Sequence, residues 1–304
     1  MVTKNIFKFS LGICLFFFSC EQESRSQIQF SEGKYVLTSN DLKVEVDPNT
    51  GGRITSFKLG EKDILLQKNI NKENYGSTLW PSPQNWPWPP SSVLDRMAYA
   101  SSVHGDTLIL ISYPDQLTGL KFSKSFSIDE RKNALTIQYT ITNISSQSLW
   151  VGPWEVTRVP SGGISFFPVD SLIKQPLSNL KSTFTKRGVT WFKFNETLLT
   201  SDQKLFQGGR LGWLAHINNG LLFVKSFPDI KHNEVAPGQG EVEIFASEFH
   251  TYIELENHGT YSFLKPGESL HYPVIWYLQR VNPSIKAALF NDDLVNSVNA
   301  MVTQ

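Results

Sequence analysis

Acidic and imidazole side chains recur at every second position near the C-terminal end of the chain. In residues 249–258, apolar residues alternate with a polar set that includes Glu254, Glu256 and His258. If this segment is a strand, these three side chains share one face, with the two carboxylates about 7 Å apart along the strand. In a partly desolvated cleft, neighbouring carboxylates push their pKa values apart, which creates an acid and a base from one residue type. The alternative is a solvent-exposed face, where alternating charged residues are common.

A second candidate segment, residues 150–158, combines tryptophan with charged residues. Regular alternation puts Trp154 and Arg158 on one face and Glu155 on the other. A bulge at Pro153 would change this assignment, so either Glu155 or Arg158 is a candidate for a cleft. An indole beside a guanidinium suits a polyhydroxylated ligand, through stacking and forked hydrogen bonds. The alternative is a buried Arg–Glu pair that stabilises the sheet.

The segment Trp80–Pro90 holds three tryptophans and five prolines in eleven residues. So much proline predicts neither a helix nor a central strand, and it predicts a rigid loop. In one interpretation the loop is a preorganised sugar-binding platform, with Trp80, Trp86 and Trp88 as stacking surfaces and Gln84 as a polar contact. In the other, the indoles close one end of the fold.

The elements that must position these side chains are β-strands. From Lys34 onward, apolar and polar residues alternate in short segments separated by turn residues, and Asn219-Gly220 predicts a tight hairpin. A short helix is expected to start near Pro283-Ser284. More than a dozen strands without a linker predict a single all-β sandwich. Expected strands include Arg53–Leu59, Leu108–Tyr113, Leu120–Ile128, Leu211–Ile217, Leu221–Phe227, Val242–Phe245, Phe249–Glu256 and Ser269–Leu278.

The N-terminus has the pattern of an export signal over residues 1–19. Lys4 and Lys8 precede an apolar run of about ten residues, which is too short to span a bilayer as a helix. Ser19-Cys20 resembles the bacterial lipobox, which implies cleavage before Cys20 and lipidation of its thiol. The alternative is an ordinary secreted protein. Residues 20–33 are expected to form a tether and residues 34–304 the domain, in a cell-envelope lipoprotein of the outer membrane, on its periplasmic or surface side.

Charge and motif content narrow the range of partners. The chain has 28 Lys and Arg against 28 Asp and Glu, so it lacks the positive charge with which proteins neutralise nucleic-acid phosphates. No HExxH motif, CxxC pair, P-loop or GxSxG motif occurs in the sequence. We therefore expect no nucleic acid, no metal and no cofactor. The expected partners are a sugar or glycan and, through the lipid anchor, a membrane.

Two segments resemble signatures of the galactose mutarotase-like superfamily. Asp47–Phe57, DPNTGGRITSF, resembles its N-terminal signature. Tyr252–Gly259, followed by LKPGESL at residues 264–270, resembles its C-terminal signature. Together with the WPSPQ and PWEVTR segments, residues 35–278 resemble the DUF4380 branch. The resemblance implies a supersandwich of large, mainly antiparallel sheets with a carbohydrate-sized cleft on the concave face.

The resemblance also implies catalytic roles of the aldose 1-epimerase type. In such enzymes, a glutamate on the strand before the PGE turn removes the proton from the anomeric hydroxyl, and a histidine acts as the acid at the ring oxygen. Glu254 or Glu256 matches the glutamate. The family's Asn-His-x-Tyr-Phe-Asn motif is missing, so Glu155 or His258 is a candidate replacement for the acid. A non-catalytic glycan-binding lipoprotein and a lyase or hydrolase on the same fold are the alternatives.

Overall fold

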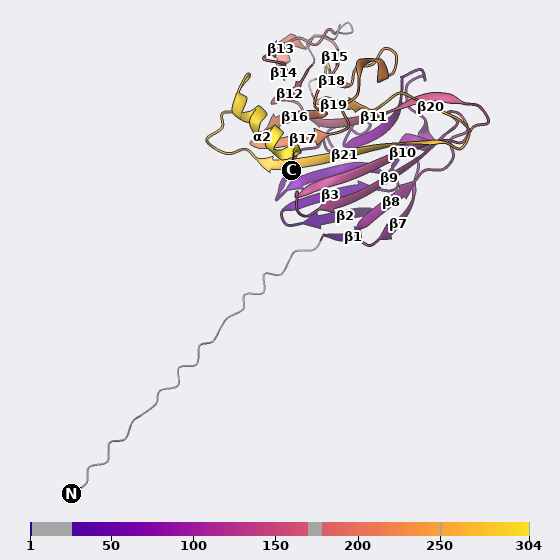
Figure 1. The fold of residues 1–304 in the computed structure, drawn as a ribbon, viewed down its shortest axis with the longest axis horizontal. Helices are drawn as coiled ribbons and strands as arrows, with labels where there is room; N and C mark the ends of the chain where they lie inside the picture. The colour runs from indigo at the N-terminus through magenta and orange to yellow at the C-terminus, as the bar shows by residue number, and fades with distance from the viewer. Residues whose placement is uncertain (2–25, 170–177, 250, 304) are drawn as a thin grey trace.

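The computed structural model describes Met1 and residues 26–169, 178–249 and 251–303. Of the expected N-terminal features, the signal peptide after Met1, the lipidation site Cys20 and residues 20–25 of the tether lie outside the described residues. The folded domain begins with strand β1 (Gln27–Ser31), before the expected boundary at residue 34. Within the described residues the chain forms two antiparallel sheets (Figure 1).

The first sheet has eleven strands and carries the candidate site. Its main order is β1-β2-β3-β4-β6-β11-β19-β18-β15, with β5 beside β4 and β20 beside β11. The strands after β1 are β2 (Lys34–Ser39), β3 (Leu42–Asp47), β4 (Arg53–Leu59), β5 (Lys62–Asp63), β6 (Ser77–Ser82), β11 (Leu149–Pro160), β15 (Gln203–Gln207), β18 (Val242–Ala246), β19 (Tyr252–His258) and β20 (Ser262–Leu264).

The second sheet has ten strands in the order β13-β14-β12-β16-β17-β21-β10-β9-β8-β7. They are β7 (Ala100–His104), β8 (Thr107–Ile111), β9 (Leu120–Asp129), β10 (Ala134–Asn143), β12 (Ile164–Pro168), β13 (Thr183–Lys186), β14 (Val189–Lys193), β16 (Trp213–Asn218), β17 (Leu221–Ser226) and β21 (Ser269–Arg280). Every expected strand from Arg53 onward is present, with its ends shifted by a few residues at most.

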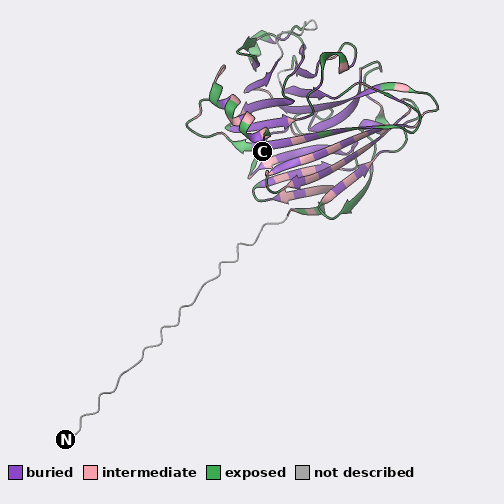
Figure 2. Cartoon of the chain, in the orientation of Figure 1, coloured by how far each residue is buried: buried purple, intermediate pink, exposed green. Residues whose placement is uncertain are grey.

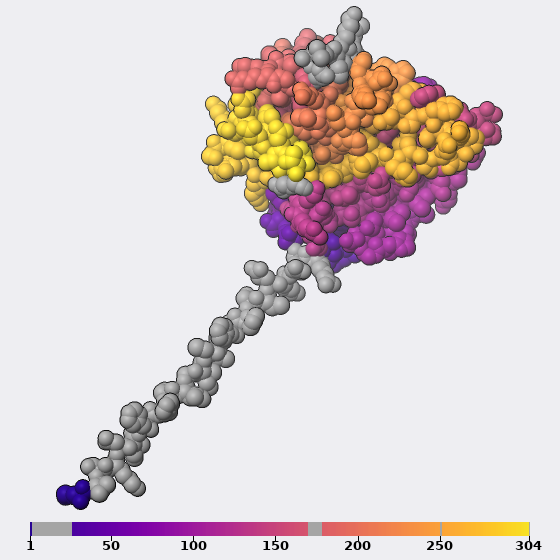
Figure 3. Space-filling view, viewed as in Figure 1, coloured from indigo at the N-terminus to yellow at the C-terminus, as the bar shows by residue number. Residues whose placement is uncertain are grey.

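One apolar core lies between the two sheets. Residues of β9 alternate strictly between buried and half-buried, because every second side chain points into the core. Phe57 of the first sheet packs edge-on against Phe223 and Trp276 of the second, with ring centroids 5.8 and 5.5 Å away. The strands are mostly buried and the loops mostly exposed (Figure 2). In the space-filling view the N-terminal strands and β7–β10 form one end of the molecule, and later segments form the other (Figure 3).

Turns form where the sequence permits a left-handed backbone. Asn219 and Gly220 have φ angles of 50° and 77° and connect β16 to β17, which confirms the predicted hairpin. Gly51 and Gly52, with φ angles of 61° and 58°, turn the chain between β3 and β4. At Gly51 a side chain would also collide with the backbone, because an added Cβ would lie 2.3 Å from the carbonyl oxygen of Asp95.

The proline-rich segment corrects one expectation. Its first residues, Trp80 to Ser82, belong to β6, a strand in the middle of the first sheet. Proline fits there because β4 pairs with β6 only at Ser77. The end of β6 therefore pairs with β11 on one side and with no strand of the described residues on the other. On that side Pro81 lies opposite Pro153, and neither can donate a backbone hydrogen bond.

Helices are short among the described residues. Helix α1 spans Ser92–Asp95, and two 3₁₀ turns span Glu196–Leu198 and His232–Glu234. The C-terminal helix α2 (Asp292–Val302) begins later than expected, because the side chain of Asn291 caps it by accepting the amide of Asp293. Its residues Leu294, Val298 and Met301 join the core. No described helix has both the length and the apolarity needed to cross a membrane.

Candidate functional site

Strand pairing brings the predicted site residues into one patch on the first sheet. Between β11 and β19, Trp154 lies opposite His258, Val156 opposite Glu256, and Arg158 opposite Glu254. On the other side of β11, Trp154 lies opposite Trp80 of β6. Because paired residues point to the same face of a sheet, these side chains form a continuous patch. The face is buried rather than solvent-exposed: every residue of β19 is buried.

Glu256 lies at the centre of a buried charge network. The indole Nε1–H of Trp154 donates to Glu256 Oε2 at 2.7 Å. The ammonium of Lys204 lies 2.9 Å from the same oxygen and 2.6 Å from Oε2 of Glu243. The ring of His258 stacks on Trp154, with its Nε2 3.2 Å from Glu243 Oε1. One cation thus bridges two carboxylates that are both fully buried.

The two carboxylates of this network have pKa values shifted in opposite directions. Burial raises the pKa of Glu256 above its usual range; Lys204 opposes the shift, and the charge of Glu243 adds to it. Burial would also raise the pKa of Glu243, but His258 and Lys204 outweigh it and lower that pKa. The network therefore holds one carboxyl group suited to keeping a proton at neutral pH and one suited to staying ionised.

Arg158 and Glu254 form the second part of the patch. Arg158 Nε donates to Glu254 Oε1 at 2.8 Å, and the guanidinium carbon lies 5.0 Å from the ring centroid of Trp80. Arg158 is fully buried, whereas Glu254 is 8% exposed. Within the described part of the chain, the two terminal nitrogens of Arg158 and Oε1 of Glu256 lack a hydrogen-bond partner. Such buried polar atoms are costly unless water or a ligand satisfies them.

Asp95 anchors the edge of this patch. Its carboxylate accepts hydrogen bonds from the Nε1–H of Trp80 at 2.9 Å, from Thr78 Oγ1 at 2.8 Å and from Arg53 at 3.1 Å. Burial would raise the pKa of Asp95, but Arg53 and the Trp80 hydrogen bond lower it below its usual range. An ionised Asp95 therefore fixes the orientation of the Trp80 indole.

Glu155 lies on the opposite face of β11, between the two sheets. It is fully buried, with Oε2 2.9 Å from the ammonium of Lys225 and Oε1 accepting the hydroxyl of Tyr139 at 2.7 Å. The structure thus separates Glu155 from Glu254 and Glu256, since regular alternation continues past Pro153. Its position is that of a charge pair within the core, and Arg158 is the charged residue of β11 that belongs to the patch.

The tryptophan-rich segment folds over the patch. Trp86 lies against Trp154 and Trp80, with centroid distances of 6.3 and 5.9 Å, and its Nε1–H donates to the carbonyl of Pro81. Trp88 lies edge-on to Trp80 at 5.6 Å and remains 54% exposed. Gln84 is exposed. Trp80 and Trp154 are therefore covered, and Trp86 and Trp88 retain accessible surface.

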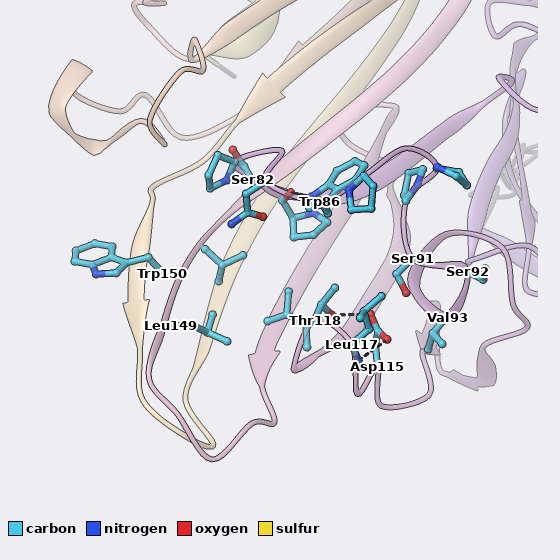
Figure 4. A pocket seen from close by; sticks show the side chains of 18 residues that line it. Ser82, Trp86, Ser91, Ser92, Val93, Asp115, Leu117, Thr118, Leu149 and Trp150 are labelled. Atoms are coloured by element: carbon cyan, nitrogen blue, oxygen red, sulfur yellow. Dashed lines mark hydrogen bonds between the residues drawn. The ribbon is translucent and has the colours of Figure 1, made fainter.

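A cavity of about 830 Å³ opens beside this covering loop. Figure 4 shows Trp86 and neighbouring prolines on one side of it and the turn containing Asp115, Leu117 and Thr118 on another, with Leu149 and Trp150 at a third. Glu254, Glu256 and Arg158 do not line this cavity. Trp86 belongs to both places, because it lines the cavity and also packs against Trp154.

Sequence reasoning missed Lys204, Glu243 and Asp95. Glu243 carries a usable signal, because it alternates with Val242 and Ile244 in an expected strand. Lys204 carries none, since nothing local indicates that β15 lies beside β18. Glu243, Glu256 and His258 also offer ligand atoms within 4.8 Å of one another, a spacing compatible with a metal ion. The ammonium of Lys204 already bridges these two carboxylates, so it supplies the positive charge that a bound metal ion would otherwise supply.

Comparison with known proteins identifies the family. The family described as "Domain of unknown function (DUF4380)" matches residues 81–279, so this chain belongs to it. No curated protein matches the chain significantly.

Solved structures that resemble the chain share its fold at low sequence identity. A TPR-domain containing protein from Parabacteroides distasonis has a TM-score of 0.61 and 15% identity. The match covers 84% of this chain and 49% of that protein, so this chain spans about half of its length. A galactose mutarotase related enzyme from Lactobacillus acidophilus has a TM-score of 0.60 and 11% identity, covering 83% of this chain and 99% of its own. A putative aldose 1-epimerase from Escherichia coli K12 has a TM-score of 0.52 and 15% identity, covering 82% and 99%. The predicted galactose mutarotase-like sandwich is confirmed.

Proposed function

We propose that the chain binds a sugar at the patch formed by Glu254, Glu256, Arg158, Trp154 and Trp80, and that it exchanges the anomers of that sugar by acid–base catalysis. The observation that carries the proposal is the unsatisfied polar surface of this patch. The terminal nitrogens of Arg158 and Oε1 of Glu256 are buried without partners among the described residues. Ring hydroxyls would supply both the donors and the acceptors that these atoms need.

The proton transfers follow from the environments of the two carboxyl groups. Glu256, whose pKa burial raises, keeps a proton at neutral pH and donates it to the ring oxygen. Glu254, hydrogen-bonded to Arg158, accepts the proton of the anomeric hydroxyl. The ring opens, the exposed carbonyl rotates, and reversal of both transfers closes it. Arg158 orients the sugar, and Lys204 fixes the charge state of Glu243.

Access requires the covering loop to move. Trp86 rests on Trp154 and Trp80, so a sugar reaches the carboxylates when Trp86 leaves that contact. One polar bond that holds the loop to the sheet runs from Trp86 Nε1–H to the carbonyl of Pro81, at the end of β6. In the displaced position, Trp86 and Trp88 would remain close to the sugar as stacking surfaces.

The test is anomer exchange measured by NMR exchange spectroscopy over a panel of aldoses and uronic acids. We expect acceleration by the wild type and a loss of about 10²- to 10⁴-fold in Glu254→Gln and in Glu256→Gln. Glu61→Gln, at an exposed carboxylate, is the matched control and should retain full activity. If both site variants equal the wild type on every accelerated sugar, the assignment of these residues fails. Binding without acceleration would instead favour a non-catalytic glycan-binding protein.

We also propose that the mature protein begins at a lipidated Cys20 and is held in the outer membrane. The support is the pattern of Lys4, Lys8, the apolar run and Ser19-Cys20. Intact mass of protein extracted from bacterial envelopes should show the lost signal and added acyl chains. Cys20→Ser should abolish both lipidation and partition into detergent, whereas Cys14→Ser should not. Unmodified wild-type Cys20 would refute the anchor.

A further inference from the structure

The 830 Å³ cavity beside the covering loop is separate from the carboxylate patch and has its own chemistry. Its walls come from three parts of the chain: residues 81–93, the turn at residues 115–120, and the start of β11 at residues 149–151. This volume falls toward the upper end of the range of roughly 300 to 1,000 Å³ for small-molecule sites. It is therefore large enough for a ligand of more than one ring.

One flat apolar surface borders the cavity, and a second lies at its rim. Trp86 stands on one wall among prolines that restrict its backbone. At the rim, Trp150 points its indole away from the other lining side chains (Figure 4) and is 55% exposed. Its ring stacks on Tyr261 with centroids 5.1 Å apart and an interplanar angle of 29°. Phe263 lies 5.4 Å from Trp150 and is 49% exposed, which extends the aromatic surface beyond the cavity. Contiguous exposed apolar surface is typical of interaction sites.

Apart from Asp115, the polar side chains that line the cavity in the described residues are neutral. Asn85, Ser91, Ser92 and Thr118 contribute amide and hydroxyl groups to its lining. Asp115 is its one acidic lining residue, and both of its oxygens are engaged, by Thr118 Oγ1 at 2.6 Å and by the amide of Leu117 at 3.2 Å. In the described part of the chain, no lysine, arginine or histidine lines it. An anionic ligand would lose its hydration here without gaining a counter-charge.

One buried hydroxyl at the cavity lacks a partner. Ser82 lines the cavity at the end of β6 and is 2% exposed. Its Oγ has no hydrogen-bond partner within the described part of the chain. A hydroxyl-bearing ligand would satisfy this atom, whereas a purely apolar ligand would leave it unpaired.

We propose that this cavity binds a neutral oligosaccharide. Trp86 stacks on a sugar ring inside the cavity, Ser82 and Asn85 bond the hydroxyls, and Trp150 stacks on a ring that extends past the rim. Sugar rings combine C–H faces with hydroxyl edges, which matches walls that combine indoles with neutral hydroxyl and amide groups. The proposal does not depend on catalysis at Glu254 and Glu256, because these residues lie outside the cavity. Trp86 connects the two places, so that a glycan held in the cavity would lie next to the loop that covers the carboxylates.

The test is isothermal titration of the full mature domain with hexasaccharides. The probes are maltohexaose, cellohexaose and xylohexaose, with an acidic hexagalacturonate and a proline-rich decapeptide as competing classes. We expect at least one neutral hexasaccharide to bind and the acidic one not to bind. Trp150→Ala should weaken that binding by about 2- to 12-fold, the range expected for one aromatic contact. Tyr113→Ala is the control, because the Tyr113 side chain is similarly exposed, at 60%, and does not line the cavity. This variant should bind the hexasaccharide as the wild type does.

The outcomes separate this proposal from the proposed catalysis. Glu256→Gln should lose anomer exchange and keep hexasaccharide binding. The cavity proposal is overturned if Trp150→Ala and Tyr113→Ala bind every neutral hexasaccharide equally, or if only the acidic glycan or the peptide binds. Neither outcome affects the conclusion drawn from the anomer-exchange assay. A lack of exchange activity, with hexasaccharide binding weakened by Trp150→Ala, would leave the cavity proposal intact.

Discussion

Lys204 is the residue at which the buried charge network can be perturbed most directly. Its ammonium lies 2.6 Å from Glu243 and 2.9 Å from Glu256, and both carboxylates are fully buried. Lys204→Met keeps most of the side-chain volume and removes the positive charge. The variant would hold two buried carboxyl groups whose shared cation is gone.

The expected loss follows from the burial of the partners. Removing one member of a buried ion pair costs about 3–5 kcal/mol, because it leaves an uncompensated charge. The Lys204 side chain is 22% exposed, so we expect a loss of unfolding free energy near the lower end, about 3 kcal/mol at pH 8. At about 2–4 °C per kcal/mol, the melting temperature should fall by roughly 6–12 °C.

The loss should depend on pH with a defined sign. Removing Lys204 raises the pKa values of both Glu243 and Glu256 relative to the wild type, because both carboxyl groups lose the cation that lowers their pKa, and only His258 still lowers that of Glu243. A carboxyl group with a raised folded pKa stabilises the fold below its unfolded pKa, and that stabilisation is lost as the pH rises through its folded value. The deficit of Lys204→Met relative to the wild type should therefore shrink as the pH is lowered from 8 to 5.

Urea unfolding followed by tryptophan fluorescence at pH 5, 6.5 and 8 measures this. Adding Glu243→Gln to Lys204→Met should recover part of the loss, because Glu243 is the buried carboxyl group that the network keeps ionised. Lys34→Met is the control: Lys34 has a side chain that is 38% exposed and pairs with Glu45 at 3.2 Å. An ion pair at the surface contributes about 0–1 kcal/mol. A deficit of Lys204→Met below about 1 kcal/mol at pH 8, or one that is the same at pH 5 and pH 8, would refute the reasoning.

Three further predictions concern single residues. Glu155→Gln leaves the Lys225 ammonium unpaired between the sheets and should lower the unfolding free energy by about 3–5 kcal/mol; a change under 1 kcal/mol in urea titration would contradict the buried pair. Gly51→Ala places a Cβ 2.3 Å from the carbonyl oxygen of Asp95 and should lower the unfolding free energy by about 1–3 kcal/mol. Gly105→Ala is the control, because Gly105 has the same φ of 61° and no atom within 4 Å of the added Cβ; equal melting temperatures of the two variants would disprove the clash. Because burial raises the pKa of Glu256, anomer exchange should fall on the alkaline side as its proton is lost, and a rate that climbs steadily from pH 6 to pH 9 would exclude Glu256 as the donor.

Local sequence patterns account for most of the strands and for one side of the candidate site. Alternation with period two identifies β19 and places Glu254, Glu256 and His258 on one face, because that relation depends only on the geometry of a strand. The same argument correctly groups Trp154 with Arg158 on β11. Asn219-Gly220 identifies a hairpin because those two residue types accept a left-handed backbone.

Local patterns fail where the answer depends on neighbours distant in sequence. Alternation could not tell whether the polar face of β19 is exposed, since that depends on β11 and β18 lying beside it and on the loop at Trp86 covering β11. Proline content predicted a loop throughout Trp80–Pro90, yet its first residues complete β6. The rule against proline in central strands assumes a partner on both sides, and the end of β6 has only one.

The sequence alone determined the strand-rich fold class, the hairpin and the grouping of carboxylates on one strand, because periodicity and turn propensity act between residues close in the chain. Only the tertiary structure decided that Lys204 and Glu243 complete the charge network and that Glu155 belongs to the core instead. It also decided that the aromatic loop borders a neutral cavity. These outcomes depend on which strands become neighbours and on how far each group is removed from water, and both are set by the packing of the whole chain.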